Sequence, residues 1–293
     1  MKIGVLIIAH NQPDYLKDLV NYLKNDFSIF IHIDKRSDIP ETIFKDDNNI
    51  HVIKKHNVYW GSYNLISATY DLLKLAYENQ CDYFLVISGC DFPVKKNREI
   101  ISEIENSPDI SYVDHSPLPR KDWLLNGGFD RLHLWWEIVK NPNSSSLFNR
   151  LCALGRMIQR LLNIKRKLLP LTYYGGSNWI NLSKEAVEYM LDYTEEHPEF
   201  LRSFHFTRVG DEIWLQTLLL NSPLREKIIS NSKRYIDWTS GPEFPRILRI
   251  SDFDKIMQSN AFFARKFDRK IDNKIYEEIK SYISHESTIQ GIS

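Results

Sequence analysis

The stretch Met1-Lys2-Ile3-Gly4-Val5-Leu6-Ile7-Ile8-Ala9-His10-Asn11-Gln12-Pro13 decides the fold. Its apolar run is short and rich in β-branched residues, and a turn sequence closes it, which is typical of a buried strand. The run lacks a small-residue cleavage site, so we do not interpret it as a signal peptide. Pro13 suits the first turn of a helix, and apolar residues then recur at helical spacing. The sequence therefore opens with a βα unit.

The rest of the first hundred residues repeats this alternation of apolar strands and helical patterns. We expect strands over Ile29–Ile33, His51–Ile53 and Tyr83–Ser88, and a helix from about residue 62 to 79. Such a rhythm predicts βαβ units, and hence an α/β fold with a Rossmann-like central mixed sheet flanked by helices. Ligands collect beyond the carboxyl ends of such strands. Here those ends carry His10, Asp34 and Asp91.

The second half of the chain is less regular. Prolines, glycines and a Trp135-Trp136 pair loosen the pattern between residues 107 and 170, which indicates an acceptor-side insertion. Order returns with three predicted elements and a predicted capping box. These are a strand Asn178–Leu182, a helix capped by Ser183, a helix Asp211–Asn221, and the box formed by Ser251 with Asp254. We expect one domain, with a nucleotide-binding half (1–106), an acceptor and catalytic half (107–270) and a C-terminal helix or tail (271–293).

Composition excludes several classes of protein. The 293 residues carry 38 Lys plus Arg against 38 Asp plus Glu, so no long-range field favours nucleic acid. A hydrophobic content of 43% excludes a disordered chain. Cys81, Cys90 and Cys152 have neither zinc-site spacing nor the even count of a disulfide framework, which favours a reducing compartment. Hydrolase Gly-x-Ser-x-Gly and phosphate-loop motifs are absent from the sequence.

The segment Val209–Leu218 places Asp211 and Glu212 at the predicted start of a helix. A carboxylate there can act as a general base, a role that contributes about 10²–10⁴ in rate. The plainer interpretation is that Glu212 only stabilises the helix dipole. Asp211 can fill that second role, which leaves Glu212 for chemistry.

A phosphate-bearing ligand would need either a metal or placed cations. Mg²⁺ or Mn²⁺ bound against a diphosphate calls for two carboxylates one residue apart, and Gly89-Cys90-Asp91 supplies one. We therefore predict no metal site at Asp91. Arg249 and Lys266 are the candidate cations, although solvated helix faces would also hold such residues. Gly175-Gly176-Ser177 would let backbone amides approach a sugar or phosphate, or would form an ordinary tight turn.

Seven segments in this order together resemble the core-2/I-branching β-1,6-N-acetylglucosaminyltransferase family, which includes peptide O-xylosyltransferases and plant glucuronosyltransferases. The resemblance runs from about Lys2 to Asp268. The segments are Ile8-Ala9-His10-Asn11, Ile31-His32-Ile33-Asp34-Lys35-Arg36-Ser37, Val58-Tyr59-Trp60-Gly61-Ser62, Ser88-Gly89-Cys90-Asp91-Phe92-Pro93, Gly175-Gly176-Ser177-Asn178-Trp179, Asp211-Glu212 and Ala264-Arg265-Lys266-Phe267-Asp268.

This resemblance implies a GT-A type fold and an inverting transfer from a UDP-sugar without a bound metal or other cofactor. By the same resemblance Glu212 falls on the catalytic base. Donor-side residues would be His10, Asp34, Trp60, Gly61, Asp91, Gly176, Ser177, Arg249 and Lys266, of which Arg249 and Lys266 would bind the diphosphate. Acceptor-side residues would be Asp130, Arg131 and Trp136, with Trp135 and Glu137 in the same cleft.

We expect the chain to move a sugar, with GlcNAc favoured, to a hydroxyl of a glycan or glycolipid acceptor in bacterial surface polysaccharide synthesis. Xylosyl or glucuronosyl transfer, a metal-dependent reaction through Asp91, and non-catalytic carbohydrate binding are the alternatives. Glycoside hydrolysis by Glu212 with Asp130 is a further one, but it leaves Arg249 and Lys266 unexplained. A cytoplasmic location is expected because the animal members' anchor and luminal cysteines are missing. The basic, leucine-rich segment Arg150–Leu169 suggests peripheral contact with the inner membrane, or else a solvated helix face.

Overall fold

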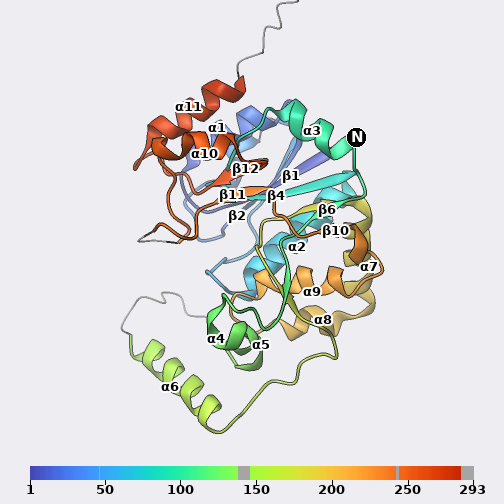
Figure 1. Cartoon of the computed structure of the whole chain (residues 1–293), viewed down its shortest axis with the longest axis vertical. Coiled ribbons are helices and arrows are strands. Elements are labelled where there is room, and N and C mark those ends of the chain that lie inside the picture. Colours follow the sequence, from blue (N-terminus) through green and yellow to red (C-terminus); the bar gives the residue numbers. More distant parts are fainter. Residues whose placement is uncertain (46, 138–145, 242–243, 285–293) are drawn as a thin grey trace, which may run out of the picture.

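The computed structural model describes residues 1–45, 47–137, 146–241 and 244–284. Its centre is a seven-stranded sheet with the strand order β10-β6-β9-β4-β1-β2-β3 (Figure 1). The first four strands of the chain run parallel, while β9 is antiparallel to both β4 and β6, so the sheet is mixed as predicted. The strands are β1 (Ile3–Ala9), β2 (Ser28–Ile33), β3 (Ile50–Ile53), β4 (Tyr83–Ser88), β6 (Ser111–Tyr112), β9 (Asn181–Ser183) and β10 (Ile228–Ile229).

Helices cover both faces of this sheet, because alternate strand residues point to opposite sides. Val5 and Ile7 of β1 belong to one buried cluster, and Leu6 and Ile8 belong to the other. The first cluster includes residues of α1 (Pro13–Leu23), α3 (Asn97–Glu105) and α11 (Asn273–Ser284). The second includes residues of α2 (Tyr63–Glu78), α7 (Lys184–Glu196) and α9 (Trp214–Leu220). The predicted α/β class with helices on both faces is confirmed.

Short elements fill the second half and connect the sheet to its loops. Two small sheets accompany the large one, with the strand orders β11-β12-β5 and β7-β8. These remaining elements are η1 (Glu41–Phe44), β5 (Phe92–Pro93), β7 (Ser116–Pro117), α4 (Leu124–Gly127), α5 (Phe129–His133), α6 (Leu147–Leu161), β8 (Tyr174–Gly175), α8 (Pro198–Ser203), η2 (Gly210–Glu212), η3 (Arg225–Lys227), β11 (Arg234–Ile236), η4 (Ile250–Asp252), α10 (Phe253–Met257) and β12 (Phe263–Arg265). No helix in the described ranges is both long and apolar enough to cross a bilayer.

Three local predictions need correction. The strand predicted from Asn178 begins only at Asn181, although the Ser183 cap is confirmed, since its hydroxyl accepts from the Ala186 N–H at 3.3 Å. The helix predicted from Asp211 is broken: a 3-10 turn ends at Glu212, and Ile213, with φ −129°, separates it from α9. The predicted Ser251 and Asp254 capping box is also wrong.

Asp252 makes the cap there instead, since its carboxylate accepts from the Arg249 N–H at 2.8 Å. The turn thus begins two residues earlier than its sequence pattern indicated. The predicted division of the chain at residue 106 stays a prediction. The central sheet takes strands from both sides of that position.

Leu85 tests how strongly the central strand supports the fold. It is fully buried on β4, between β1 and β9. We expect Leu85→Ala to lower the free energy of unfolding by about 2–5 kcal/mol, because it removes buried methyl groups and leaves a cavity. Urea denaturation followed by circular dichroism measures this. Leu124→Ala is the control, since Leu124 is 85% exposed and its loss should change stability by less than about 0.5 kcal/mol. Equal effects of the two substitutions would contradict this placement of the core.

Candidate functional site

Glu212 sits in a loop that the backbone holds on two sides. Its carbonyl accepts from the Gly176 N–H at 2.9 Å, and its own N–H donates to the Val209 carbonyl at 3.3 Å. Its carboxylate accepts from Arg131 Nη1, which lies 2.7 Å from Glu212 Oε2. Glu212 is the last residue of η2, and α9 begins two residues later at Trp214. The predicted base is therefore fixed by contacts that are distant in sequence.

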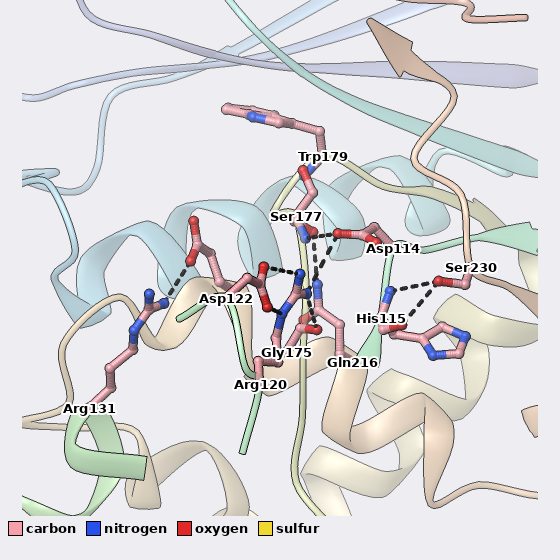
Figure 2. Close-up of polar contacts among 11 residues, drawn as sticks. Asp114, His115, Arg120, Asp122, Arg131, Gly175, Ser177, Trp179, Gln216 and Ser230 are labelled. Carbon is pink, nitrogen blue, oxygen red and sulfur yellow. Dashed lines mark hydrogen bonds and ion pairs between the residues drawn. The ribbon is translucent and has the colours of Figure 1, made fainter. Parts of the chain in front are cut away.

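Gly176 has to be glycine for this arrangement to close. A Cβ built at Gly176 would lie 1.8 Å from the Asp114 carbonyl oxygen, which is far inside any allowed contact. The same loop is bonded on both sides (Figure 2). The Ser177 N–H donates to Asp114 Oδ2 at 3.0 Å, and Gln216 Nε2 donates to the Ser177 carbonyl at 2.8 Å. Gly176 and Ser177 were predicted to approach a ligand, and these bonds give them a structural role as well.

Arg131, which contacts the Glu212 carboxylate, shares the Trp123 ring with a second arginine. The Arg131 guanidinium carbon lies 3.8 Å from the centroid of the Trp123 ring, and that of Arg120 lies 4.8 Å from the same ring. Arg120 Nη1 also donates to the Gly175 carbonyl at 2.9 Å. Arg131 was predicted to contact an acceptor, yet its guanidinium is committed to Glu212. Neither Arg120 nor Trp123 was singled out from the sequence, because only the folded chain brings residues 120–131 next to residue 212.

Burial controls the ionisation of the acidic pair. It raises the pKa of Glu212 above the usual range, and the charge and hydrogen bond of Arg131 oppose that rise. Burial also raises the pKa of Asp211 to about 8, and the neighbouring charge of Glu212 adds to this. Asp211 Oδ1 has no hydrogen-bond partner among the residues that the structure describes. A carboxyl group of Glu212 in this setting can hold a proton at a pH where an exposed one would have lost it.

The ends of β1 and β2 form a second polar cluster. Burial lowers the pKa of His10, Asp34 opposes that change, and the nearby charge of Lys266 lowers the pKa further. The Arg36 side chain donates two hydrogen bonds to the Asp34 carboxylate, from Nη2 to Oδ2 at 2.6 Å and from Nε to Oδ1 at 3.1 Å. The Arg36 guanidinium carbon also lies 3.9 Å from the centroid of the Tyr59 ring. His10 and Asp34 thus lie near each other at adjacent strand ends, and Arg36, which stood in the same family-like segment as Asp34, forms an ion pair with it. Their role in binding a donor stays a prediction.

Asp91 belongs to the scaffold. Its side chain is fully buried and accepts from the Ser88 N–H at 3.0 Å and the Ser88 hydroxyl at 2.6 Å. Arg265 Nε lies 3.3 Å from the same carboxylate, and its guanidinium carbon lies 4.1 Å from the centroid of the Trp179 ring. The prediction that Asp91 contacts a donor is therefore corrected, since its oxygens face the interior. No group of three or more His, Cys, Asp or Glu suited to a metal occurs in the described ranges.

The two predicted phosphate-binding cations lie in different surroundings. Lys266 follows β12, its carbonyl accepts from the Leu248 N–H at 2.9 Å, and its charge acts on His10. Arg249 is exposed at the start of η4, and its charge acts instead on Asp272, where it helps to lower the pKa of that carboxyl. Lys266 therefore joins the strand-end cluster. No described contact places Arg249 in that cluster.

A cavity of about 190 Å³ lies beside the Glu212 loop. Gly61, with φ +70°, lets the chain turn so that its carbonyl accepts from the Val209 N–H at 2.8 Å. The cavity therefore shares a wall with the loop that carries Glu212. Its lining consists of Tyr59, Trp60, Gly61, Ser62, Tyr63, Asn64, Trp136, Glu137, His205, Phe206, Thr207 and Arg208. Trp60 and Gly61, predicted for the nucleotide side, thus line one cavity with Trp136, predicted for the acceptor side.

Arg208 gives this cavity its charge. Its guanidinium carbon lies 5.0 Å from the centroid of the Trp60 ring and 5.1 Å from that of Trp136. Burial lowers the pKa of Arg208, and the nearby charges of Arg156 and Arg131 lower it further. Each of those neighbours has an acidic partner, Glu137 for Arg156 and Glu212 for Arg131. Within the described part of the chain, no carboxylate lies within ion-pairing distance of Arg208.

Asp130, the remaining acceptor prediction, stands at the edge of this region. Its carboxylate pairs with Arg160 Nε at 3.1 Å, and its carbonyl accepts from Trp136 Nε1 at 2.9 Å. Asp130 therefore holds the cavity wall in place.

Comparison with known proteins gives the same family as the motifs. The family model described as "Branch: Core-2/I-Branching enzyme" matches residues 11–258. Mouse xylosyltransferase 1 is 24% identical over 293 residues, which cover 90% of this chain and 28% of that protein. Rat xylosyltransferase 2 is 24% identical, with coverage of 94% and 33%. The chain thus spans about a third of these relatives' length. The solved structure of mouse xyloside xylosyltransferase 1 matches with a TM-score of 0.43 at 10% identity, covering 90% of this chain and 97% of that one.

Asp211 makes stability depend on pH in a testable direction. Its pKa is raised in the folded protein, so its contribution is fully present below the usual value of 3.8 and is lost as pH rises toward about 8. We expect the wild-type free energy of unfolding to fall over that range. In Asp211→Asn the free energy of unfolding should fall less over this pH range, so the variant should gain stability relative to the wild type near pH 8. Denaturant titrations at several pH values measure it, with exposed Asp192→Asn as control. Parallel curves for wild type and Asp211→Asn would refute the assignment.

Proposed function

We propose that this chain, which belongs to the Core-2/I-Branching enzyme family, is an inverting transferase that moves a sugar from a UDP-sugar to an acceptor hydroxyl. Membership of that family makes it a glycosyltransferase. The observation that carries the proposal is the Glu212 carboxylate, which is half-buried, paired with Arg131 and carried by a loop beside an aromatic cavity.

Glu212 would act as the general base. An acceptor hydroxyl needs a proton acceptor as its oxygen attacks the anomeric carbon, and a buried carboxylate with a raised pKa binds that proton more strongly than an exposed one. Arg131 would keep Glu212 ionised before the reaction, because its positive charge favours the carboxylate form. Arg131 would therefore be a positioning residue, since it acts through Glu212.

The departing UDP would be bound at the strand-end cluster. Lys266 keeps its predicted role there, because its charge already acts on His10 and a cation at a partly excluded site attracts phosphate strongly. The Asp34 and Arg36 pair would meet the ribose or the base edge. Arg249 stays a prediction for the same site, since the neighbouring Leu248 N–H donates to the Lys266 carbonyl at 2.9 Å while the charge of Arg249 also acts on Asp272. We propose that side-chain charge replaces a metal, and the internal bonds of Asp91 support this.

For the donor sugar we propose xylose ahead of GlcNAc. The mouse and rat relatives compared above, which align with 90% and 94% of this chain, are xylosyltransferases, whereas GlcNAc rests only on the resemblance noted from the sequence motifs. The acceptor would be a glycan or glycolipid bound in the cavity. Sugar rings stack on aromatic faces such as Trp60 and Trp136, and Arg208 between them would bind an acidic group. The proposed acceptor therefore carries a carboxylate or phosphate close to the reacting hydroxyl.

Donor use can be tested by UDP release from a panel of UDP-sugars in excess EDTA. We expect release from UDP-xylose to persist in EDTA. Glu212→Gln should lower turnover by about 10²–10⁴, because the base is lost. Lys266→Ala should also lower it, because the leaving diphosphate loses a cation. Glu226→Gln and Lys270→Ala are matched controls on exposed residues. Release that requires Mn²⁺ would exclude the metal-free mechanism, and release only from UDP-GlcNAc would exclude xylose.

The acceptor subsite can be tested separately through Arg208. We expect Arg208→Gln to raise the KM for a glucuronate-bearing acceptor at least tenfold and to leave the KM for its neutral glucose analogue little changed. Hydrolysis of the donor without acceptor should be unaffected, because Arg208 would touch only the acceptor. Exposed Arg202→Gln is the control. An equal change of KM for both acceptors would remove the proposed anion contact.

A further inference from the structure

The helix α6 (Leu147–Leu161) carries an exposed apolar face. Figure 1 shows it at the end of the molecule farthest from α11, away from the central sheet. The side chains of Leu147 and Leu161, at its two ends, are 72% and 74% exposed. Large exposed apolar residues occur on this helix and directly after it. They are Leu147, Phe148, Leu151, Leu154, Met157, Ile158, Leu161, Leu162 and Ile164.

These residues form a stripe along one side of α6, since Leu147, Leu151, Leu154, Ile158 and Leu161 are spaced by three or four. A soluble amphipathic helix turns such a stripe toward its own core. In α6 the apolar stripe faces outward, which is the reverse of that arrangement.

The polar side of α6 is the side that contacts the protein. Arg156 pairs with Glu137 at 2.9 Å, and Arg160 pairs with Asp130 at 3.1 Å. The Gln159 side chain accepts from the Trp135 N–H at 2.8 Å and donates to the Trp135 carbonyl at 3.3 Å. These bonds fix the rotation of the helix, so the apolar stripe is held outward by specific partners.

The charge of residues 147–169 indicates which kind of partner covers the apolar stripe of α6. Residues 147–169 contain six Lys and Arg and no Asp or Glu. Three of the six, Arg150, Lys165 and Lys167, are exposed and have no acidic partner in the described ranges. A symmetric pairing of two copies would set the same positive patch against itself, which is unfavourable. An anionic lipid surface suits both the unpaired cations and the exposed apolar stripe. Its headgroups attract the cations, and the acyl boundary accepts the apolar side chains.

We propose that α6 is an interfacial helix that docks the protein on an anionic membrane. The helix lies in the plane of the bilayer surface, with the stripe from Leu147 to Leu161 at the acyl boundary and Arg150, Lys165 and Lys167 among the headgroups. None of the described helices crosses the bilayer in this arrangement.

This docking also orients the acceptor cavity, a consequence that rests on the proposed function. The partners of α6 on the protein side are Asp130, Trp135 and Glu137, and Glu137 lines the cavity. A membrane under α6 therefore lies on the acceptor side of the site. The acceptor class that fits this geometry is a glycan on a lipid anchor, delivered from the same surface.

The test measures vesicle binding alone, without any sugar donor, so its result does not depend on catalysis. The purified 293-residue chain is sedimented with phosphatidylcholine vesicles and with vesicles that also contain phosphatidylglycerol. We expect binding to the anionic vesicles, and at least a tenfold loss of affinity for Leu151→Glu/Ile158→Glu. Lys165→Glu/Lys167→Glu should weaken binding and reduce its dependence on lipid charge. Arg166 is left intact, because it donates to the Ser203 and Leu132 carbonyls.

Ile250→Glu/Ile271→Glu is the matched control, since both isoleucines are exposed to a similar degree and lie on the C-terminal elements near α11. Circular dichroism checks that every variant folds. Unchanged vesicle binding in the α6 variants, or no binding by the wild type, would overturn the proposal. A wild-type dimer in light scattering that Leu151→Glu/Ile158→Glu converts to a monomer would overturn it too, in favour of contact between copies.

Discussion

A half-buried carboxylate with a cationic partner is the constraint on which the site depends. Burial raises the pKa of Glu212, and Arg131, 2.7 Å away, opposes that rise and favours the charged form. Arg131 in turn lies over the Trp123 ring, and Trp123 packs so closely against Gly175 that a Cβ at Gly175 would come within 2.5 Å of the ring. The Arg131–Glu212 ion pair therefore depends on the Trp123 ring, and the position of that ring depends on glycine at position 175.

The sheet explains why these distant residues meet. Antiparallel β9 pairs with both β4 and β6, and the turn from β8 to β9 carries Gly176 against Asp114 and Glu212. The parallel strands β1 and β2 end at the opposite part of the site, where His10, Asp34 and Lys266 gather. The proposed donor side thus lies at the ends of parallel strands, and the proposed base is held by the turn that leads into antiparallel β9.

The cavity and α6 together make up the acceptor face that we propose. Arg208 is held in the cavity by two tryptophan rings, whereas Arg156 and Arg160 are neutralised by acids that fasten α6 to the same wall. Charged residues of α6 and of the cavity therefore contact the protein, whereas the apolar stripe of α6 faces solvent. Both features are costly for a protein that meets only water, and both suit one that meets an acidic, lipid-linked acceptor at a surface.

The sequence by itself determined the parallel strands, the helices α1 and α2 and the family, because these depend on local periodicity and on motifs in a fixed order. It also singled out His10, Asp34 and Glu212 as candidates, since polar residues at strand ends and in loops stand out from apolar surroundings, and their roles stay predictions. The broken start of α9 and the scaffold role of Asp91 were decided by tertiary structure. Whether a charged side chain is free or paired depends on residues far away in the chain. Arg131 and Arg208 look alike in sequence, and only folding gives one of them a carboxylate and leaves the other between two aromatic rings.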